Sequence, residues 1–258
     1  MTQGSVAFDR AVDYYDQTRG FPPGVEQHAT QLFVKAGALT PDSQVLEVAV
    51  GTGRIALPLA PHVGSITGLD LSLPMLNKLI EKRKDERVQV VQGDGTHLPF
   101  KANAFDAAIA VHFFHLIPTW RDALAELRRV LRPGGVLMHG WTSRDMDERL
   151  DRVWQGATGR GRGAERGVPF EQRETFLLES GWTEVGTEHV YLFTVERIPQ
   201  SYVENLRARL WSHTWSMSDE QLNEGIQALE TYIRENIADP TAPMQIQSSF
   251  HVRAYQPN

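Results

Sequence analysis

The stretch Val45-Leu46-Glu47-Val48-Ala49-Val50-Gly51-Thr52-Gly53-Arg54-Ile55-Ala56 decides the fold of this chain. Its first residues are typical of a buried strand, and they run into a tight turn that contains Gly51 and Gly53. Neither glycine has a Cβ, so the backbone can bend sharply there and approach a ligand closely. The residues after the turn predict a helix, whose first N–H groups are unpaired and attract a polar or anionic group. By itself, the stretch also fits an ordinary strand–turn–helix corner.

Strands and helices alternate after this turn. The apolar patterns predict strands at 65–70, 88–92, 105–111 and 136–141, and helices at 53–61, from Ser72 to Lys84, and at 119–131. This alternation predicts a parallel, doubly wound α/β sheet with helices on both faces. Ligands of such sheets bind at the edge where the strands end. The glycine turn, Asp70, Asp94 and His112 follow four successive strands, so we expect them to meet at that edge.

The two flanking parts of the chain are less regular. Residues 5–38 read as helices broken by a turn at 18–24. In the C-terminal half, the patterns predict helices at 145–155, 169–180, 200–216 and 218–237, a loop at 156–163, and strands at 185–198 and 244–255. The helices at 200–237 are rich in apolar and aromatic residues, which fit either a cap over a small acceptor or a helix pair that packs on itself. Arg160, Arg162 and Arg166 in the Gly/Arg-rich loop fit a solvated surface or a contact with an anion.

Composition excludes several classes of protein. The chain of 258 residues carries 26 Lys and Arg against 32 Asp and Glu, a net charge of −6, so a broad nucleic-acid-binding face is not expected. It has no cysteine, which excludes disulfides, thiol catalysis and thiolate metal sites and suits a cytoplasmic location. No secretory signal and no apolar run of about 20 residues is present, so we expect no membrane span. No histidine or carboxylate spacing indicates a metal site.

These motifs together resemble the class I S-adenosylmethionine-dependent methyltransferases, most closely the ubiquinone-biosynthesis-like branch that acts on small molecules. Glu47–Gly53 stands where the family has an acidic residue and three alternating glycines, the first being Ala49 here. Asp70 ends the second strand as the family's ribose-binding acid does, and Gly93–Phe100 resembles its adenine-side loop. Leu131–Gly135 resembles the turn before its fifth strand, and Tyr15–Gly20 its N-terminal lid. The resemblance covers roughly residues 10–140.

The resemblance implies a seven-stranded Rossmann-like sheet in one domain, 1–258. Its parts would be an N-terminal helical lid (1–40), a cofactor-binding core (41–142), and a C-terminal half (143–258) with a helical cap at about 199–238 between the last two strands. The implied cofactor is S-adenosyl-L-methionine, with S-adenosyl-L-homocysteine as product. The implied cofactor-binding residues are Tyr15, Arg19, Glu47, Ala49, Gly51, Thr52, Gly53, Asp70, Leu71, Met75, Asp94, Gly95, Thr96, Val111 and His112.

The chemistry of four of these side chains fits that cofactor. An ionised Asp70 can accept hydrogen bonds from both ribose hydroxyls, and Asp94 can accept from the adenine amino group. Arg19 can clamp the carboxylate of the methionyl tail, and the ring of Tyr15 can cover the sulfonium. Each has an ordinary alternative: Asp70 as part of a helix cap, Asp94 as a turn residue, and Tyr15 and Arg19 as the end of a surface helix.

The implied reaction is methyl transfer to an oxygen, nitrogen or carbon nucleophile of a small molecule. It is an in-line displacement in which alignment and the exclusion of water supply much of the rate acceleration. A general base is needed only where the acceptor is protonated. His115 is the candidate base, although it also fits a packed core histidine; His139 and His213 are weaker candidates. The identity of the acceptor and the oligomeric state stay open.

Three other functions remain as alternatives. Gly51-Thr52-Gly53-Arg54-Ile55-Ala56 also satisfies the G-x-G-x-x-A fingerprint of nicotinamide-binding enzymes. Glu47, the Gly93–Gly95 loop and the Arg132–Gly135 turn argue against that alternative. A cofactor-binding protein without catalytic activity, or with a regulatory role, has the same motifs. RNA methylation is disfavoured by the net charge and by the residues Val111-His112-Phe113-Phe114 after the fourth strand.

Overall fold

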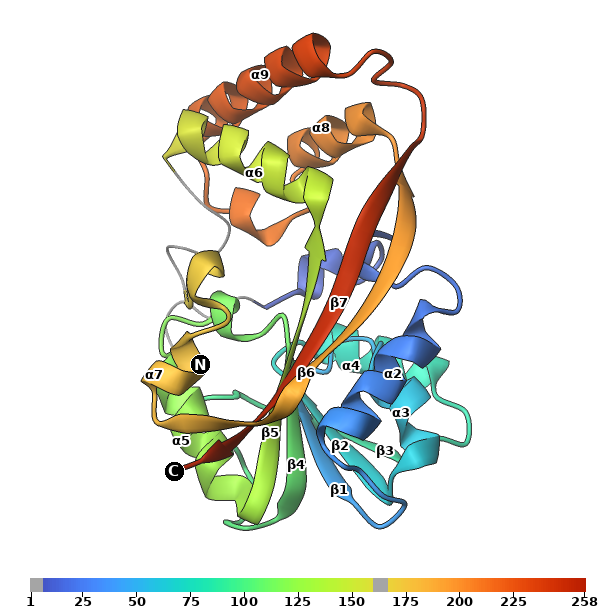
Figure 1. The fold of residues 1–258 in the computed structure, drawn as a ribbon, viewed down its shortest axis with the longest axis vertical. Coiled ribbons are helices and arrows are strands. Elements are labelled where there is room, and N and C mark those ends of the chain that lie inside the picture. The colour runs from blue at the N-terminus through green and yellow to red at the C-terminus, as the bar shows by residue number, and fades with distance from the viewer. Residues whose placement is uncertain (1–6, 160–166) are drawn as a thin grey trace.

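The computed structural model describes residues 7–159 and 167–258. They form a seven-stranded sheet in the order β3-β2-β1-β4-β5-β7-β6 (Figure 1). The strands are β1 (Gln44–Val48), β2 (Ser65–Asp70), β3 (Val88–Gln92), β4 (Phe105–Val111), β5 (Leu131–Arg144), β6 (Trp182–Arg197) and β7 (Met244–Pro257). Strands β1 to β5 pair in parallel, whereas β7 runs antiparallel to both β5 and β6. The predicted doubly wound, Rossmann-like fold is confirmed, with an antiparallel addition at one end.

Helices precede, connect and cap the strands. They are α1 (Tyr15–Arg19), α2 (Val25–Ala36), α3 (Ala56–Leu59), α4 (Leu73–Lys82), α5 (Trp120–Val130), α6 (Asp145–Thr158), α7 (Phe176–Glu179), α8 (Pro199–Arg207) and α9 (Asp219–Asn236). Short 3-10 helices lie at Asp9–Ala11, Ala60–His62, Phe114–Leu116, Phe170–Gln172 and Ser212–Thr214. Across the described residues, none of the helices combines the length and the apolar character that crossing a lipid bilayer requires.

Local sequence explains the helix that supports the site. Ser72 begins α4, because its hydroxyl accepts a hydrogen bond from the N–H of Met75 at 3.3 Å. Pro74 lies in the first turn, where its missing N–H costs nothing. Met75, Leu76 and Leu79 are buried against the sheet. The helix therefore has a fixed start directly after β2, which sets the position of the residues between Asp70 and Met75.

A helical cap stands at the far end of β5, β6 and β7 (Figure 1). It contains α8 and α9, inserted between β6 and β7 as predicted, and it also contains α6, which the sequence did not place there. Ser218 and Gln221 form a reciprocal capping box at the start of α9. Gly225 of α9 lies against Trp154 of α6, and a Cβ there would meet the indole ring at 2.5 Å. Glycine at this position therefore lets the two helices pack closely.

Two predicted helices are wrong in extent. The segment 200–216 is helical only to Arg207, and Arg209 has a positive φ of 53°. The Arg209 carbonyl accepts a hydrogen bond from Trp215 Nε1 at 2.8 Å, and its guanidinium binds the carbonyls of Thr214 and Met217. These bonds stabilise a turn where periodicity predicts a helix. The segment 169–180 is a 3-10 turn followed by the single-turn α7. Arg160, Arg162 and Arg166 lie outside the described residues.

Candidate functional site

The glycine turn after β1 bends sharply, as its sequence predicts. Gly51 and Gly53 have positive φ values of 56° and 81°, and so does Ala49, at 53°. A Cβ at Gly53 would lie 2.9 Å from carbons of Leu57 and Leu79, so only glycine fits there without a shift of its neighbours. Ala49 adopts the same left-handed backbone with a side chain, which costs on the order of 1 kcal/mol. The turn is therefore held in its shape by the surrounding fold.

Asp70, at the end of β2, joins this turn to α4. Its Oδ2 accepts a hydrogen bond from the N–H of Gly51 at 2.8 Å, and its Oδ1 accepts one from the N–H of Ser72 at 2.9 Å. Burial raises the pKa of Asp70, while the N–H groups of Ser72 and Gly51 oppose that rise. The carboxylate thus has the helix-cap contact that was the ordinary alternative, and at the same time it lies on the glycine turn.

Glu47, within β1, is a buried carboxyl directly below the turn. Only 3% of the residue is exposed, and burial raises its pKa to about 8 against the opposing charge of Arg54 and the N–H of Ala56. Its Oε2 has no hydrogen-bond partner within residues 7–159 and 167–258. An unpaired buried polar atom costs free energy of folding, so its presence in the fold calls for an explanation such as a ligand. Glu47 Oε2 therefore fits a ligand that carries a hydrogen-bond donor, such as an amine.

The first helix of the chain covers the turn. A methyl group added to Gly51 would lie 3.7 Å from Met75 Cε and 3.9 Å from Tyr15 Cε1, so both side chains approach this glycine. Burial raises the pKa of Tyr15, which keeps its phenol neutral. Asp16 fastens the helix: its Oδ1 accepts from Thr52 Oγ1 at 2.5 Å, and its Oδ2 accepts from Lys82 Nζ at 2.9 Å. The sequence did not assign a role to Asp16 or Lys82.

Arginines link the lid to the core and to the cap. Arg54 Nη1 donates to the carbonyl of Arg19 at 2.5 Å, and the Arg54 guanidinium lies 4.5 Å from the ring centre of Phe21. The Arg19 guanidinium lies 5.9 Å from the ring centre of Trp211 in the cap. The helix that covers the glycine turn is therefore in contact with both halves of the molecule. The predicted role of Arg19 as a carboxylate clamp stays a prediction.

The loop after β3 lies beside Asp70, because the N–H of Gly93 donates to the Asp70 carbonyl at 3.0 Å. Asp94 Oδ1 accepts from the N–H and the hydroxyl of Thr96, at 2.9 and 2.8 Å. This pattern is the turn-stabilising role that the sequence left as an alternative. A Cβ at Gly95 would lie 2.6 Å from the ring of Phe113, so the loop packs closely against the segment that follows β4. Leu71 is held nearby, since its carbonyl accepts from Gln92 Nε2 at 3.2 Å.

The segment after β4 completes the edge. Val111 is buried at the end of the strand, and His112 has a positive φ of 53°, a conformation that is uncommon outside glycine and clusters at functional sites. The rings of His112 and His115 are 6.2 Å apart, edge to face. Both histidines are partly buried. The predicted meeting of four strand ends is thus found in the structure, with the glycine turn, Asp70, Asp94 and His112 along one edge of the sheet.

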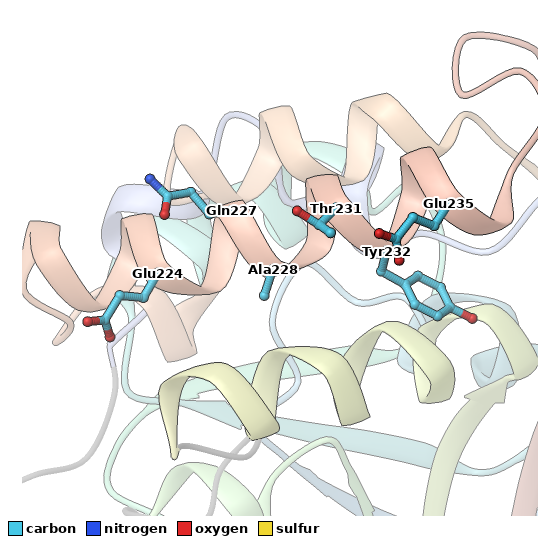
Figure 2. Close-up of a pocket in the computed structure, with 6 residues that line it drawn as sticks. All are labelled: Glu224, Gln227, Ala228, Thr231, Tyr232 and Glu235. Atoms are coloured by element: carbon cyan, nitrogen blue, oxygen red, sulfur yellow. The ribbon is translucent and has the colours of Figure 1, made fainter.

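A shallow groove on the cap is separate from this edge. It is open to solvent and is lined by residues of α9, namely Glu224, Gln227, Ala228, Thr231, Tyr232 and Glu235 (Figure 2). None of them belongs to the strand ends or to the lid. The groove therefore adds nothing to the candidate site.

Comparison with known proteins identifies the core. Residues 46–139 match the family described as a methyltransferase domain. The demethylmenaquinone methyltransferase of Lactiplantibacillus plantarum is 31% identical over 156 residues, which are 57% of this chain and 66% of that protein. The enzyme of the same name from Renibacterium salmoninarum is 36% identical over 132 residues, 51% of this chain and 55% of its own. The chain thus spans between about half and two thirds of the length of these relatives.

Solved structures share the fold. A methyltransferase-like protein from Bacillus halodurans superposes with a TM-score of 0.61 and 21% identity, covering 91% of this chain and 100% of its own. A Haemonchus contortus phosphoethanolamine N-methyltransferase, solved with phosphomonomethylethanolamine and S-adenosylhomocysteine, has a TM-score of 0.54 and 19% identity. It covers 97% of this chain and 58% of its own. Residues 46–139 therefore form a methyltransferase domain, and the similarities of the chain point to the class I S-adenosylmethionine-dependent methyltransferases of the ubiquinone- and menaquinone-like branch.

Proposed function

We propose that this chain transfers the methyl group of S-adenosylmethionine to an oxygen, nitrogen or carbon atom of a small molecule, and that residues 1–258 act as one domain. The observation that carries the proposal is the pair of hydrogen bonds of Asp70, which fix a carboxylate between the glycine turn and the start of α4. The match to a methyltransferase domain supports S-adenosylmethionine as the cofactor. The position of Asp70 at the second strand end supports its role as the ribose acceptor.

The residues around the glycine turn also fit the methionyl end of the cofactor. The methionyl tail carries an ammonium group, and Glu47 Oε2 is a buried acceptor without a partner among the described residues. The positive-φ turn at Gly51 and Gly53 leaves room for a close approach to the backbone. We propose that Gly51, Thr52 and Gly53 contact the tail, and that Asp94, Gly95 and Thr96 contact the adenine. Leu71, Met75, Val111 and His112 would line the remainder, with Ala49 at the base of the turn.

The chain's own residues would act by alignment and by the exclusion of water. The cofactor, when bound, supplies an activated methyl group on a sulfonium leaving group. Tyr15 and Asp16 hold the lid over the glycine turn, so that solvent is kept from this edge of the sheet. Alignment of this kind accounts for a large share of the acceleration in group transfer. His115 is the residue we propose as proton acceptor for a protonated nucleophile, because it lies in the short 3-10 helix Phe114–Leu116 just beyond the end of β4.

Calorimetric titration of the full chain tests the proposal. S-adenosylmethionine and NADPH are each titrated into the wild type, Asp70→Asn and Asp94→Asn. We expect heat with S-adenosylmethionine only, and a dissociation constant raised about tenfold or more in Asp70→Asn, since a carboxylate acceptor contributes roughly 1.5–3 kcal/mol. Asp122→Asn is the matched control, because Asp122 is exposed on α5. Binding of NADPH alone, or equal affinity in wild type and Asp70→Asn, would refute the proposal.

A further inference from the structure

We propose that Trp215 of the cap is a positioning residue for the cofactor. Through Phe8 it holds Tyr15 over the glycine turn, so that the retention of S-adenosylmethionine depends on the cap. The inference rests on the proposed function and adds to it a residue from outside the cofactor-binding core. In Figure 1, the dark-blue N-terminal segment lies between the core and the cap, which is the place that such a connection requires.

The N-terminal segment, residues 7–20, cannot hold its position by itself. It contains the 3-10 helix Asp9–Ala11 and α1, which has five residues. Helices this short are not stable in isolation, and each residue of α1 keeps some exposure to solvent. Contacts with other parts of the molecule must therefore hold the segment, and their loss would release Tyr15 from the glycine turn.

Aromatic contacts join this segment to the cap. The ring of Phe8 stands edge to face against two other rings, with its centre 5.3 Å from that of Trp215 and 5.8 Å from that of Tyr15. The Arg10 guanidinium lies 4.9 Å from the ring centre of Trp215. Edge-to-face rings attract each other, and a cation is attracted to the face of an indole. Phe8 therefore connects the ring over the glycine turn to a ring of the cap.

Trp215 is itself fixed within the cap. Its Nε1 donates to the carbonyl of Arg209 at 2.8 Å, and its backbone N–H donates to the carbonyl of Ser212 at 3.2 Å. The Arg209 guanidinium binds the carbonyl of Met217 at 2.9 Å and the carboxylate of Asp219 at 2.7 Å. We call residues 209–217 the cap turn. Because these bonds hold the cap turn together, Trp215 offers a fixed surface to Phe8.

The exposure of the two rings fits a contact between moving parts better than a place in the core. Phe8 and Trp215 are both partly exposed, and within the described chain neither belongs to the two buried apolar clusters. Breaking their contact should therefore free the N-terminal segment without unfolding the core. A Cβ on Gly51 would lie 3.9 Å from Tyr15 Cε1, so movement of Tyr15 would uncover the glycine turn.

The rate of cofactor release from the full chain tests the inference. Bound radiolabelled S-adenosylmethionine is chased with unlabelled cofactor and followed by rapid filtration. We expect Trp215→Leu and Phe8→Leu each to raise the dissociation rate about fivefold, the factor that one aromatic pair gives. Trp215→Phe, which keeps a ring, should restore most of the wild-type rate. Tyr232→Leu is the matched control and should leave the rate unchanged, because Tyr232 is an aromatic residue of the cap in the groove on α9 (Figure 2).

A double-mutant cycle separates positioning from a general loss of stability. Because Trp215 acts through Phe8, the variant with both leucines should release the cofactor about as fast as either single variant. Linkage adds a reciprocal readout, since the cofactor must stabilise the cap turn by the same factor. The N–H groups of Thr214, Trp215 and Met217 are hydrogen-bonded within this turn. Their hydrogen exchange should slow about fivefold when S-adenosylhomocysteine is added to the wild type, and should not change in Phe8→Leu.

Each outcome decides between a positioning role and simple packing. Wild-type release rates in both leucine variants would overturn the inference. So would multiplication of the two effects in the double variant, or exchange in the cap turn of the wild type that ignores S-adenosylhomocysteine. If Trp215→Leu fails to fold, Phe8→Leu carries the test, because Phe8 lies outside the cap. Failure of the wild type to bind S-adenosylmethionine refutes the proposed function and this inference with it, whereas binding with unchanged release in the variants refutes this inference alone.

Discussion

Thr52 Oγ1 donates a 2.5 Å hydrogen bond to Asp16 Oδ1 and thereby fastens the first helix of the fold to the glycine turn. Lys82 Nζ, at the end of α4, lies 2.9 Å from the other oxygen of the same carboxylate and 3.3 Å from Thr52 Oγ1. Three segments that are far apart in the sequence therefore meet at one carboxylate. Because Tyr15 directly precedes Asp16 in α1, the bonds of Asp16 also hold Tyr15 against Gly51.

Lys82→Met should speed the release of S-adenosylmethionine. The ion pair is partly exposed, so its contribution is modest, about 0.5–1 kcal/mol, and we expect the dissociation rate to rise about twofold to fivefold. Stopped-flow displacement measures this rate. Lys78→Met is the matched control, since Lys78 pairs with Glu81 on the exposed side of the same helix. Equal dissociation rates in the two variants would show that Asp16 does not hold the lid closed.

Ala49→Gly should stabilise the fold. Relief of the strain in the left-handed backbone at φ 53° stabilises the folded state by about 1–2 kcal/mol. The greater conformational entropy of glycine in the unfolded chain offsets about 0.4–1 kcal/mol of this gain. We therefore expect a net gain of roughly 0.5–1 kcal/mol in the free energy of unfolding, measured with urea. Ala36→Gly, in the last turn of α2, should have the opposite sign. Destabilisation by both substitutions would show that the methyl group of Ala49 contributes packing that outweighs its strain.

The stability of the Glu47→Gln variant relative to the wild type should increase as the pH rises. The pKa of Glu47 is raised to about 8 in the fold from 4.5, so between these values the folded state holds a proton that the unfolded state has lost. The stability that this proton contributes is complete below pH 4.5 and is lost as the pH rises through 8. Glutamine removes the titration. We expect the stability difference between variant and wild type to grow by about 1–3 kcal/mol from about pH 5 to pH 8 in urea unfolding. A constant difference across this range would contradict the raised pKa.

His139→Phe should make the protein less sensitive to acid. Burial lowers the pKa of His139 to about 3 from 6.5, so in this window the unfolded state binds the extra proton. The corresponding stability is present above pH 6.5 and is lost as the pH falls toward 3. We expect the wild type to lose about 1 kcal/mol more than the variant on acidification from about pH 6.5 to 5.5, because one proton per pH unit corresponds to 1.36 kcal/mol. Parallel curves for the two proteins would indicate that His139 is not buried in its neutral form.

The core of the fold could be predicted because each of its signals is local. Strands β1 to β4 are short apolar runs, and Ser72 and Pro74 mark the start of α4 within a few residues of Asp70. The cap was predicted less well, because the turn at Arg209 depends on bonds to Thr214 and Met217 that compete with the helical pattern. No periodicity could reveal that Asp16 meets Lys82, which is 66 residues further along the chain.

The partners of the side chains of β5 could not be predicted from the sequence for a related reason. The run 136–141 reads as a strand whichever face is buried, and the partners of His139 and Trp141 come from β7, more than 100 residues later. His139 pairs with Arg253, and Trp141 pairs with His251. Only this antiparallel register brings the rings and charges together on one face. The sequence therefore predicts that the four strand ends meet at one edge, whereas the stacking of His251 on Trp141 emerges only from the tertiary pairing.

The insertion of β7 between β5 and β6 has a consequence for the order of assembly during synthesis. On the ribosome, β5 and β6 emerge well before β7, and neither can complete its hydrogen bonds on that side until β7 arrives. Until then, the nascent chain presents two open strand edges, which are sites for wrong pairing and aggregation. The cap helices α8 and α9 separate β6 from β7, so the closing step must wait for their translation. Closure of the sheet therefore depends on β7, which is synthesised after the other six strands. His139 and Trp141 gain their β7 neighbours only after the strands that carry the cofactor-side edge have been synthesised.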